Sequence, residues 1–514
     1  MAGKNLFNSV KMTKPNKNVF DLSHDVKLSC NMGDLVPVMC TKCVPGDKFN
    51  VSAEALIRFA PLVAPMMHRV DVYIHYFFVP FRLVWPNWES WITNGYNGDP
   101  DPVAIPAYPY VKLNDGNYAN FPLFDYMGFP KPDVASGDFN VSAMPFACYQ
   151  KIYDEYYRDQ NNIYREYQDL VDGDNTFLLD DLVSLRKRAW EHDYFTSALP
   201  WAQKGNPVEL PLGALDDVSV LYKDPHDGDT ATVLTGTGQP SATPQNATVP
   251  FGDPNVSTGG DLFAETSELN LASTTINELR TAFRLQEWLE KAARGGSRYV
   301  EQILTFFGVK SPDARLQRPE YITGVKSPVN ISEVLNTTGT DDLPQGNMAG
   351  HGVAVVSGNR GHYFCQEHGF IMGIMSVMPK TAYQQGIPKK FDVLSDPTEE
   401  YWPQFANLGE QAILNKEIYV DHSVPGGTFG YVPRYSEYKF ENNRVAGDFK
   451  TTLDTWHMGR KFTADADLNQ VFIECDATQR VFAVTDPVVD KLYCHVLNKI
   501  TAIRPMPKYG TPTF

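Results

Sequence analysis

The sequence has little cysteine and no long apolar run. Its 514 residues include only seven cysteines, an odd number scattered along the chain, so a disulfide framework is not expected. The longest strongly apolar stretch, residues 369–378, is far too short to cross a bilayer, and the first residues lack the apolar core of a signal peptide. These absences predict a protein that folds in a reducing cytoplasm and does not insert into a membrane.

Short catalytic motifs are also missing. No GxxxxGK[ST] phosphate loop, GxSxG elbow or HExxH zinc motif occurs in the sequence. Cys40 and Cys43 have the spacing of a metal or redox pair, but neither a second pair nor neighbouring histidines complete a tetrahedral site, so two ordinary buried thiols are the preferred interpretation. We therefore expect no catalytic residue, no metal ion, no cofactor and no enzymatic activity.

Positive charge is scarce in this chain. Against 61 acidic residues stand 45 Lys and Arg, a net charge of −16, which argues against a surface that wraps nucleic acid on all sides. The exception is residues 1–20, which carry Lys4, Lys11, Lys14 and Lys17 and no acidic residue. We interpret this segment as an extended basic arm, and a solvated terminus without a partner is the alternative.

Residues 206–275 have the opposite character. They contain ten acidic residues and a single basic one, Lys223, among Gly, Pro, Ser, Thr and Asn. A structureless segment of this length inside a compact domain is uncommon unless it has a function, so we interpret it as a surface insertion. A disordered linker between domains is the alternative.

What the sequence does contain is material for a large β-rich core, with 43% hydrophobic and 12% aromatic residues and 37 each of Gly and Pro. Residues 70–79 place bulky side chains on both faces of a strand, which predicts a central strand, and Pro80 ends it. Further strands are predicted at 33–40, 353–357, 370–378, 471–473, 481–484 and 492–503, separated by long connections. Strands scattered this widely are typical of a jelly roll with enlarged loops.

Two helices and a tryptophan cluster complete the pattern. A capping box at Thr275 and Glu278 opens one helix, which Gly295 and Gly296 stop, and an aromatic stripe marks another at about 145–158. Bulky indole rings suit a core or an interface between subunits. The candidate inter-subunit anchors are Trp85, Trp88, Trp91 and Trp456, and simple core packing is the alternative for each.

Several long segments match a known pattern in the expected order. They are residues 72–85, 153–161, 192–201, 294–299, 308–321, 367–376, 381–386, 430–435, 447–449, 456–460 and 504–512. With these segments the chain resembles the major capsid protein of the microviruses, in particular its gokushovirus branch. The resemblance covers almost the whole chain, and only the acidic insertion departs from it.

The resemblance implies an eight-stranded antiparallel jelly-roll sandwich with long loop insertions and a few helices, in which residues 21–514 form a single capsid domain. It implies self-assembly into a T=1 icosahedral shell around a circular single-stranded DNA phage genome. Expected partners are a small basic internal DNA-binding protein and a scaffolding protein during assembly. The virion would assemble in the bacterial host cytoplasm, and the insertion would form threefold projections that contact a host receptor.

Two alternatives come from other classes of protein. A carbohydrate-active β-sandwich enzyme needs two carboxylates across a cleft, but Asp154–Glu155 and Glu399–Glu400 are adjacent in sequence and would point apart. A soluble carbohydrate-binding module would share the fold without assembling. Within the capsid interpretation, Lys4, Lys11, Lys14 and Lys17 are expected to face the DNA, since a packaged single strand needs neutralisation.

Overall fold

The computed structural model describes residues 16–93, 105–206, 208, 220–223, 230–232, 261–264, 276–335 and 348–509. The chain divides into two compact units, one made of Met1–Ala202 with Ala293–Phe514 and the other of Gln203–Ala292. Lys4, Lys11 and Lys14 lie outside the described residues, as does most of the 206–275 insertion.

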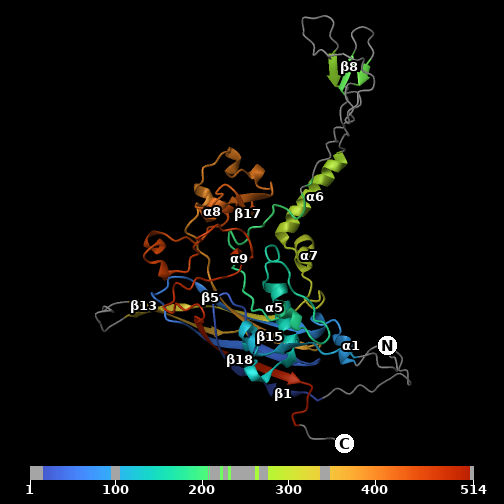
Figure 1. Ribbon diagram of the computed structural model, residues 1–514, viewed down its shortest axis with the longest axis vertical. Coiled ribbons are helices and arrows are strands. Elements are labelled where there is room, and N and C mark those ends of the chain that lie inside the picture. Colours follow the sequence, from blue (N-terminus) through green and yellow to red (C-terminus); the bar gives the residue numbers. More distant parts are fainter. Residues whose placement is uncertain are drawn as a thin grey trace, which may run out of the picture. The chain divides into compact units, whose positions relative to one another are not determined.

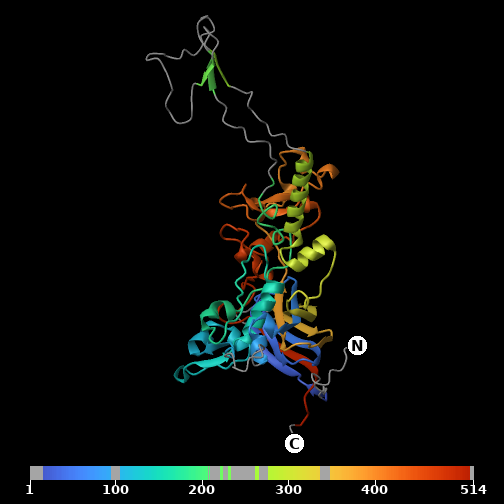
Figure 2. The same ribbon diagram turned by 90° about the vertical axis from the view of Figure 1, so that its right-hand side faces the viewer.

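Two antiparallel sheets dominate the first unit (Figures 1 and 2). The smaller sheet has four strands, in the order β11 (Glu320–Pro328), β5 (Val70–Pro80), β15 (Gly369–Pro379) and β3 (Val36–Cys43). The larger sheet has seven, which are β1 (Asn18–Asp21), β2 (His24–Cys30), β18 (Leu492–Arg504), β4 (Lys48–Phe59), β14 (Gly361–Phe364), β13 (Met348–Ser357) and β12 (Asn330–Leu335). Strand β18 pairs with β1, β2 and β4, and β13 links β4 to β12.

The two sheets pack face to face around one hydrophobic core. Along β5, Val72, Ile74 and Phe78 point into this core, while Phe77 and Val79 point to the other face. Strand β4 alternates in the same way and buries every second side chain, which are Phe49, Val51, Ala53, Ala55, Ile57 and Phe59. The prediction of a central strand with two buried faces, ended by Pro80, is confirmed because β5 lies between β11 and β15.

One polar side chain ties the sheets together inside this core. Asn498 of β18 is completely buried, and its side-chain amide donates to the carbonyl oxygen of Val38 at 2.8 Å. Its side-chain oxygen accepts from the Tyr76 hydroxyl, also at 2.8 Å. A buried amide is costly unless its hydrogen bonds are made, so this pair of bonds fixes β18 against β3 and β5 in one register.

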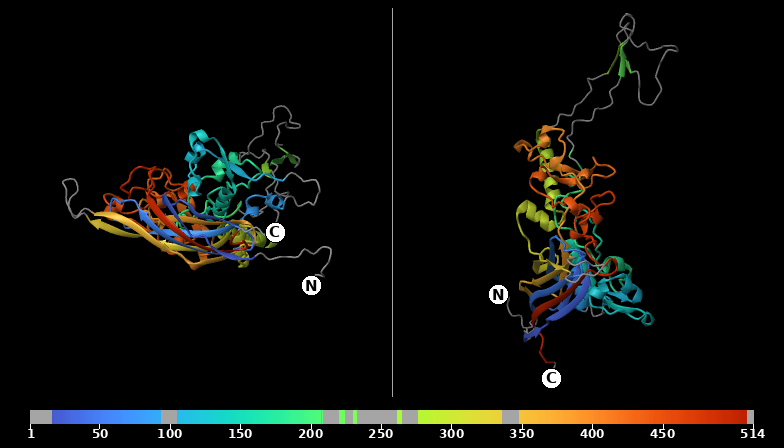
Figure 3. Two further views of the ribbon diagram at one scale, coloured as in Figure 1. Left: turned by 90° about the horizontal axis from the view of Figure 1, so that it is seen from below. Right: turned by 90° about the vertical axis from the view of Figure 1, so that its left-hand side faces the viewer.

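The outer face of the smaller sheet is covered by a second hydrophobic cluster. Figure 3 shows the two sheets as curved layers with segments from the first half of the chain on one side. The covering elements include α1 (Trp88–Ile92), β6 (Tyr110–Leu113), α2 (Asp115–Asn120), α3 (Leu123–Tyr126), β7 (Phe139–Ser142), α4 (Met144–Ile152), the π-helical turn η3 (Tyr153–Tyr157) and α5 (Leu179–Leu182).

A third cluster holds the C-terminal loops of this unit together. Its elements are the hairpin of β16 (Glu410–Leu414) and β17 (Thr428–Pro433), α8 (Asn415–Ile418) and α9 (Gln470–Ile473). Helix α7 (Tyr299–Phe307) also belongs to this unit. Short 3₁₀ helices occur at Phe81–Leu83, Val134–Ser136, Thr176–Leu178, Lys389–Phe391, Pro397–Glu399, Pro403–Phe405, Ser436–Tyr438, Gly447–Lys450 and Asp454–Trp456.

The second unit contains a small sheet and most of a long helix. Strands β10 (Asp261–Ala264), β8 (Val220–Lys223) and β9 (Thr230–Thr232) pair in that order, and α6 runs from Ile276 to Gly295. The predicted helix at 275–295 is confirmed. So is the helix at 145–158, which the structure divides into α4 and the π-helical turn.

The prediction of a mainly β protein with antiparallel sheets and a few helices is confirmed, but two predicted strands are wrong. Residues 471–473 lie in α9, because the Asn469 side chain accepts from the Phe472 backbone N–H and starts a helix. Residues 481–484 belong to none of the strands in the described part of the chain. Val481 and Phe482 are nevertheless buried in the sandwich core.

Replacing Asn498 with alanine should weaken the sandwich without changing its surface. The Asn498→Ala variant leaves the Tyr76 hydroxyl and the Val38 carbonyl buried without partners, so the free energy of unfolding should fall by roughly 2 kcal/mol or more. Tyr76→Phe, which removes only the hydroxyl, should cost about 1 kcal/mol. Urea denaturation of dissociated subunits measures both, and equal stability of Asn498→Ala and wild type would contradict the assigned role.

An ion-pair network joins the smaller sheet to the loop that carries Glu191. Glu191 accepts hydrogen bonds from Lys380 and from the Tyr73 hydroxyl, and Lys326 lies 3.5 Å from Glu191 and 2.9 Å from Asp71. Burial alone would raise the pKa of Glu191, but the bonds from Lys380 and Tyr73 outweigh it and lower this pKa to about 2.

This network predicts a defined acid sensitivity. Because the pKa of Glu191 is lower in the folded than in the unfolded chain, its contribution to stability is present at neutral pH. The contribution is lost as the pH falls from about 4.5 towards 2. Thermal melts over this range should therefore show a weaker pH dependence for Glu191→Gln than for the wild type. Identical slopes would show that Glu191 gains nothing from its partners.

Candidate assembly and nucleic-acid surfaces

The predicted tryptophan cluster follows directly after β5. Trp85 is fully buried and its indole N–H donates to Asp172 Oδ1 at 2.8 Å, and the Trp88 ring lies 4.7 Å from the Phe81 ring. The half-buried Trp91 stacks obliquely on Trp88 with ring centres 5.4 Å apart. All three rings pack in or against the cluster that covers the smaller sheet. The burial of Trp85 and Trp88 favours the core-packing alternative for these two residues.

Trp456 lies far from that cluster in sequence, at the end of a 3₁₀ helix. Its backbone carbonyl accepts from the Met67 N–H at 2.7 Å, and its side chain is half-buried. Its ring therefore keeps surface that a neighbouring subunit could cover. Contact of Trp91 and Trp456 with a neighbour stays a prediction.

Six exposed apolar side chains on the C-terminal loops were not predicted from the sequence. We call them the aromatic loop patch, and its members are Phe391, Tyr401, Trp402, Leu408, Tyr438 and Phe440. Each of these side chains is 44–65% exposed. Large exposed apolar patches on a soluble domain mark interaction sites.

The patch is held in place by its own contacts. The Trp402 indole N–H donates to the Pro397 carbonyl at 3.0 Å, and the Tyr401 ring centre lies 5.2 Å from that of Tyr435. Tyr435 is buried, so it anchors the loop that carries Tyr401. A pre-ordered apolar surface loses less conformational entropy on binding than a flexible one.

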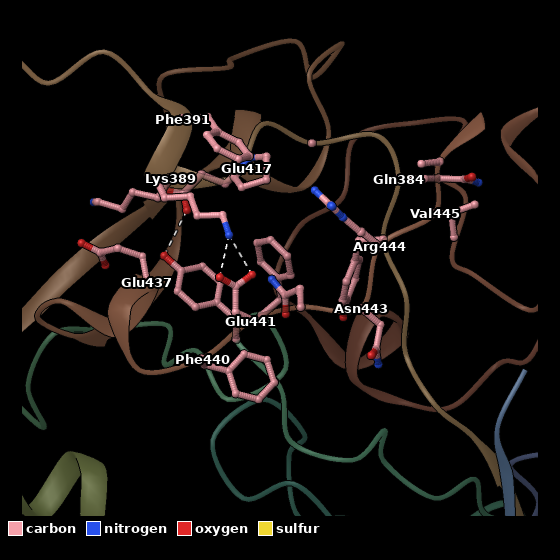
Figure 4. A pocket seen from close by; sticks show the side chains of 18 of the residues that line it. Gln384, Lys389, Phe391, Glu417, Glu437, Phe440, Glu441, Asn443, Arg444 and Val445 are labelled. Carbon is pink, nitrogen blue, oxygen red and sulfur yellow. Dashed lines mark hydrogen bonds and ion pairs between the residues drawn. The ribbon is translucent and has the colours of Figure 1, made fainter.

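A pocket lies beside the patch, with Phe391 and Phe440 in its wall (Figure 4). Lys390 forms an ion pair with Glu441 at 2.6 Å, which lowers the pKa of Glu441. Burial raises the pKa of Glu417, whose carboxylate accepts from the Leu414 N–H at 2.9 Å and the Tyr194 hydroxyl at 3.0 Å. Both carboxylates are therefore engaged in structural contacts.

The carboxylates considered for a carbohydrate-active enzyme are engaged as well. Asp154 forms ion pairs with Arg158 at 2.7 Å and Arg165 at 2.9 Å. Glu399 accepts from the Ser395 hydroxyl at 2.6 Å, and Glu400 accepts from the Tyr438 hydroxyl. These pairs hold loops together, and their geometry does not favour the enzyme alternative.

The CxxC pair does not form a metal site. Cys40 is exposed and Cys43 is buried on β3, so the two thiols do not converge. Within the described ranges, no group of three or more His, Cys, Asp or Glu side chains could hold a metal ion. No helix in that same part of the chain is long and apolar enough to cross a membrane.

Of the four arm lysines, the structure places Lys17. Its ammonium group donates to the Gly46 carbonyl at 2.9 Å and lies 5.8 Å from the centre of the Phe364 ring. Phe364 belongs to β14 and is 48% exposed on the solvent side of the larger sheet. The end of the basic arm therefore meets the larger sheet.

The chain is thus a β-sandwich protein with extensive loops, carboxylates engaged in structural contacts and exposed aromatic side chains on its loops. The family model described as "Capsid protein (F protein)" matches residues 8–514. The chain therefore belongs to the phage F capsid protein family, as its resemblance to microvirus capsid proteins predicted.

Three capsid proteins align with this chain over nearly their full lengths. The chain is 35% identical to "Capsid protein VP1" of Bdellovibrio phage phiMH2K, covering 98% of this chain and 97% of the relative. It is 33% identical to "Capsid protein VP1" of Chlamydia phage 1, with 99% and 97% covered, and 28% identical to that of Spiroplasma virus 4, with 98% and 99% covered. These relatives are structural capsid proteins, which confirms the expectation that the chain is not an enzyme.

Two tryptophan variants should separate subunit folding from assembly. Trp85→Ala opens a cavity in the core and should lower the free energy of unfolding by about 3–5 kcal/mol. Trp402→Ala removes an exposed ring and should change this free energy by less than about 1 kcal/mol, while reducing the yield of assembled particles. Denaturation and sedimentation measure the two effects. Normal assembly of Trp402→Ala would remove Trp402 from the interface.

Proposed function

We propose that this microvirus capsid protein is of the gokushovirus type and builds a T=1 icosahedral shell around a circular single-stranded DNA genome. In such a shell one copy of the chain occupies each asymmetric unit. The observation that carries the proposal is the full-length match to phage capsid proteins, with 98% of this chain aligned to 97% of one VP1 relative.

The fold part of the proposal is that the sandwich is an eight-stranded jelly roll. Support comes from the strand order, β2-β18-β4-β13 in the larger sheet and β3-β15-β5-β11 in the smaller one. Strands that are neighbours in these sheets come from opposite ends of the chain, as double Greek-key folding requires. Strands β1, β12 and β14 are then additions to the larger sheet.

The assembly part of the proposal concerns the loops. The aromatic loop patch, together with Trp91 and Trp456, contacts neighbouring subunits. The patch suits this role because aromatic residues are enriched in the buried centres of interfaces and charged residues are depleted there. Many such contacts, each modest, sum over a closed shell.

The two segments of unusual charge have opposite roles in this proposal. The acidic residues 206–275 form projections around the threefold axes and contact the host receptor, which their polar, Gly- and Pro-rich composition supports. The basic arm, with Lys4, Lys11, Lys14 and Lys17, contacts the genome. A small basic internal protein shares the neutralisation of the DNA, and a scaffolding protein assists assembly in the bacterial cytoplasm.

Particles made from the full-length chain test this function. Expression in the presence of a phage genome should give closed particles of uniform size that protect circular single-stranded DNA from nuclease. A variant with Lys4, Lys11, Lys14 and Lys17 changed to Gln should form particles with less protected DNA, because phosphate neutralisation is reduced. Subunits that sediment only as monomers would favour the carbohydrate-binding module and contradict the proposal.

A further inference from the structure

The two sides of the sandwich differ in how they are covered. Helices and loops bury the outer face of the smaller sheet, whereas no hydrophobic cluster among the described residues includes a side chain from the outer face of the larger sheet. We call this second surface the open face. It is formed by the alternate residues of β1, β2, β4, β14 and β18 that point away from the core, such as Arg58 and Tyr493.

The open face reverses the charge balance of the chain. Four cations of β2, β4 and β18 lie on it, namely Lys27, Lys48, Arg58 and Lys499. Three acidic residues of β1, β2 and β4 lie on the same face, namely Asp21, Asp25 and Glu54. The whole chain, in contrast, has a net charge of −16. Two of these acids are already paired on the face. Glu54 binds Lys499, and Asp25 Oδ1 lies 3.1 Å from His495 Nε2.

Three cations of the open face remain available. Lys27, Lys48 and Arg58 are exposed and form no ion pair with any residue in the described part of the chain. Lys48 and Arg58 are ten residues apart on β4, which corresponds to about 33 Å at the usual rise of a strand. Positive charge is thus spread along the face rather than gathered at one point.

Each exposed aromatic ring on this face has a cation as its cross-strand neighbour. Tyr493 of β18 lies opposite Arg58 of β4, and Phe364 of β14 lies opposite Lys48 of the same strand. Directly opposite residues have Cβ atoms about 5 Å apart. Tyr493 is 45% exposed and Phe364 is 48% exposed, so both rings can take a further partner. Lys17 of the basic arm approaches the same Phe364 ring.

We propose that the open face is the surface on which the shell subunit binds single-stranded DNA. Bases stack on Tyr493 and Phe364, and the adjacent phosphates contact Arg58, Lys48 and Lys27. Aromatic rings beside cations along a flat groove or sheet are the combination that binds single strands without sequence preference. This inference rests on the proposed function and extends its DNA contact from the arm to the sheet.

The binding test uses the purified full-length chain and a fluorescent 20-nucleotide thymidine oligomer, with anisotropy measured at several salt concentrations. The triple variant Lys27→Gln, Lys48→Gln, Arg58→Gln should bind at least about tenfold more weakly at low salt. The slope of log affinity against log salt should become shallower by about 2, since each phosphate contact contributes roughly 0.7. The matched control changes three exposed lysines away from this sheet, Lys310, Lys439 and Lys450, to Gln and should bind like the wild type.

A second variant tests stacking separately from charge. Tyr493→Ala should weaken binding by about fivefold or more at every salt concentration without changing the slope, and Tyr493→Phe should restore it. Because Tyr493 is exposed, neither change should alter the melting temperature by more than a few degrees. A Tyr493→Ala variant with wild-type affinity would overturn the stacking role.

The outcomes distinguish this inference from the proposed function. If the triple variant binds normally while the arm variant loses binding, the open face is not a DNA site and the DNA-enclosing shell stands. If the wild-type chain does not bind the oligomer at low salt, the open-face inference fails, whereas the DNA-enclosing shell is tested separately by nuclease protection of DNA in assembled particles. If the triple variant binds DNA normally but changes the sedimentation of the chain, the open face contacts a second copy of the protein and the inference is overturned.

Discussion

The fold depends on the pairing of the last strand with the first ones. Strand β18 pairs with β4 from Leu492 opposite Phe59 to Ile503 opposite Lys48, and with β2 and β1 along its other edge. The larger sheet is therefore incomplete until nearly the whole chain has been made. Such long-range pairing is slow to form, so the subunit closes late in synthesis, with Asn498 fixing the register against the smaller sheet.

The completed sandwich has two sides that differ in how far other parts of the chain cover them. Long insertions between strands return to cover the smaller sheet, where Trp85 and the helix α4 are buried. The larger sheet receives no such cover among the described residues, and its polar alternate positions stay exposed. A protein that separates an interior from an exterior needs this kind of asymmetry, because different partners meet its two sides.

The sequence predicted the parts of this structure that carry strong local signals. Strand β5 was found because its side chains are bulky on both faces, and α6 because of its capping box and terminal glycines. Strand β4 was missed although it alternates strictly, since Ala53 and Ala55 weaken its apolar face. Residues 471–473 were assigned to a strand because three residues are too few to separate a strand from a helical turn.

The surfaces were harder to predict than the elements. Trp85 and Trp88 looked like anchors, and only the tertiary structure shows that they are buried. Trp402 and Tyr401 lie in a loop without periodicity, so nothing local indicates that they are exposed together with Tyr438 and Phe440. The open face could not be predicted from the sequence either, because Arg58 and Tyr493 become neighbours only through the pairing of β4 with β18.

A reconstruction of the assembled particle with its genome would show whether the shell subunit has distinct inner and outer sides. We expect a T=1 shell in which the open face of the larger sheet lies against the DNA and the aromatic loop patch is buried between subunits. A particle in which the open face points outward, or in which Trp402 remains in solvent, would contradict this expectation.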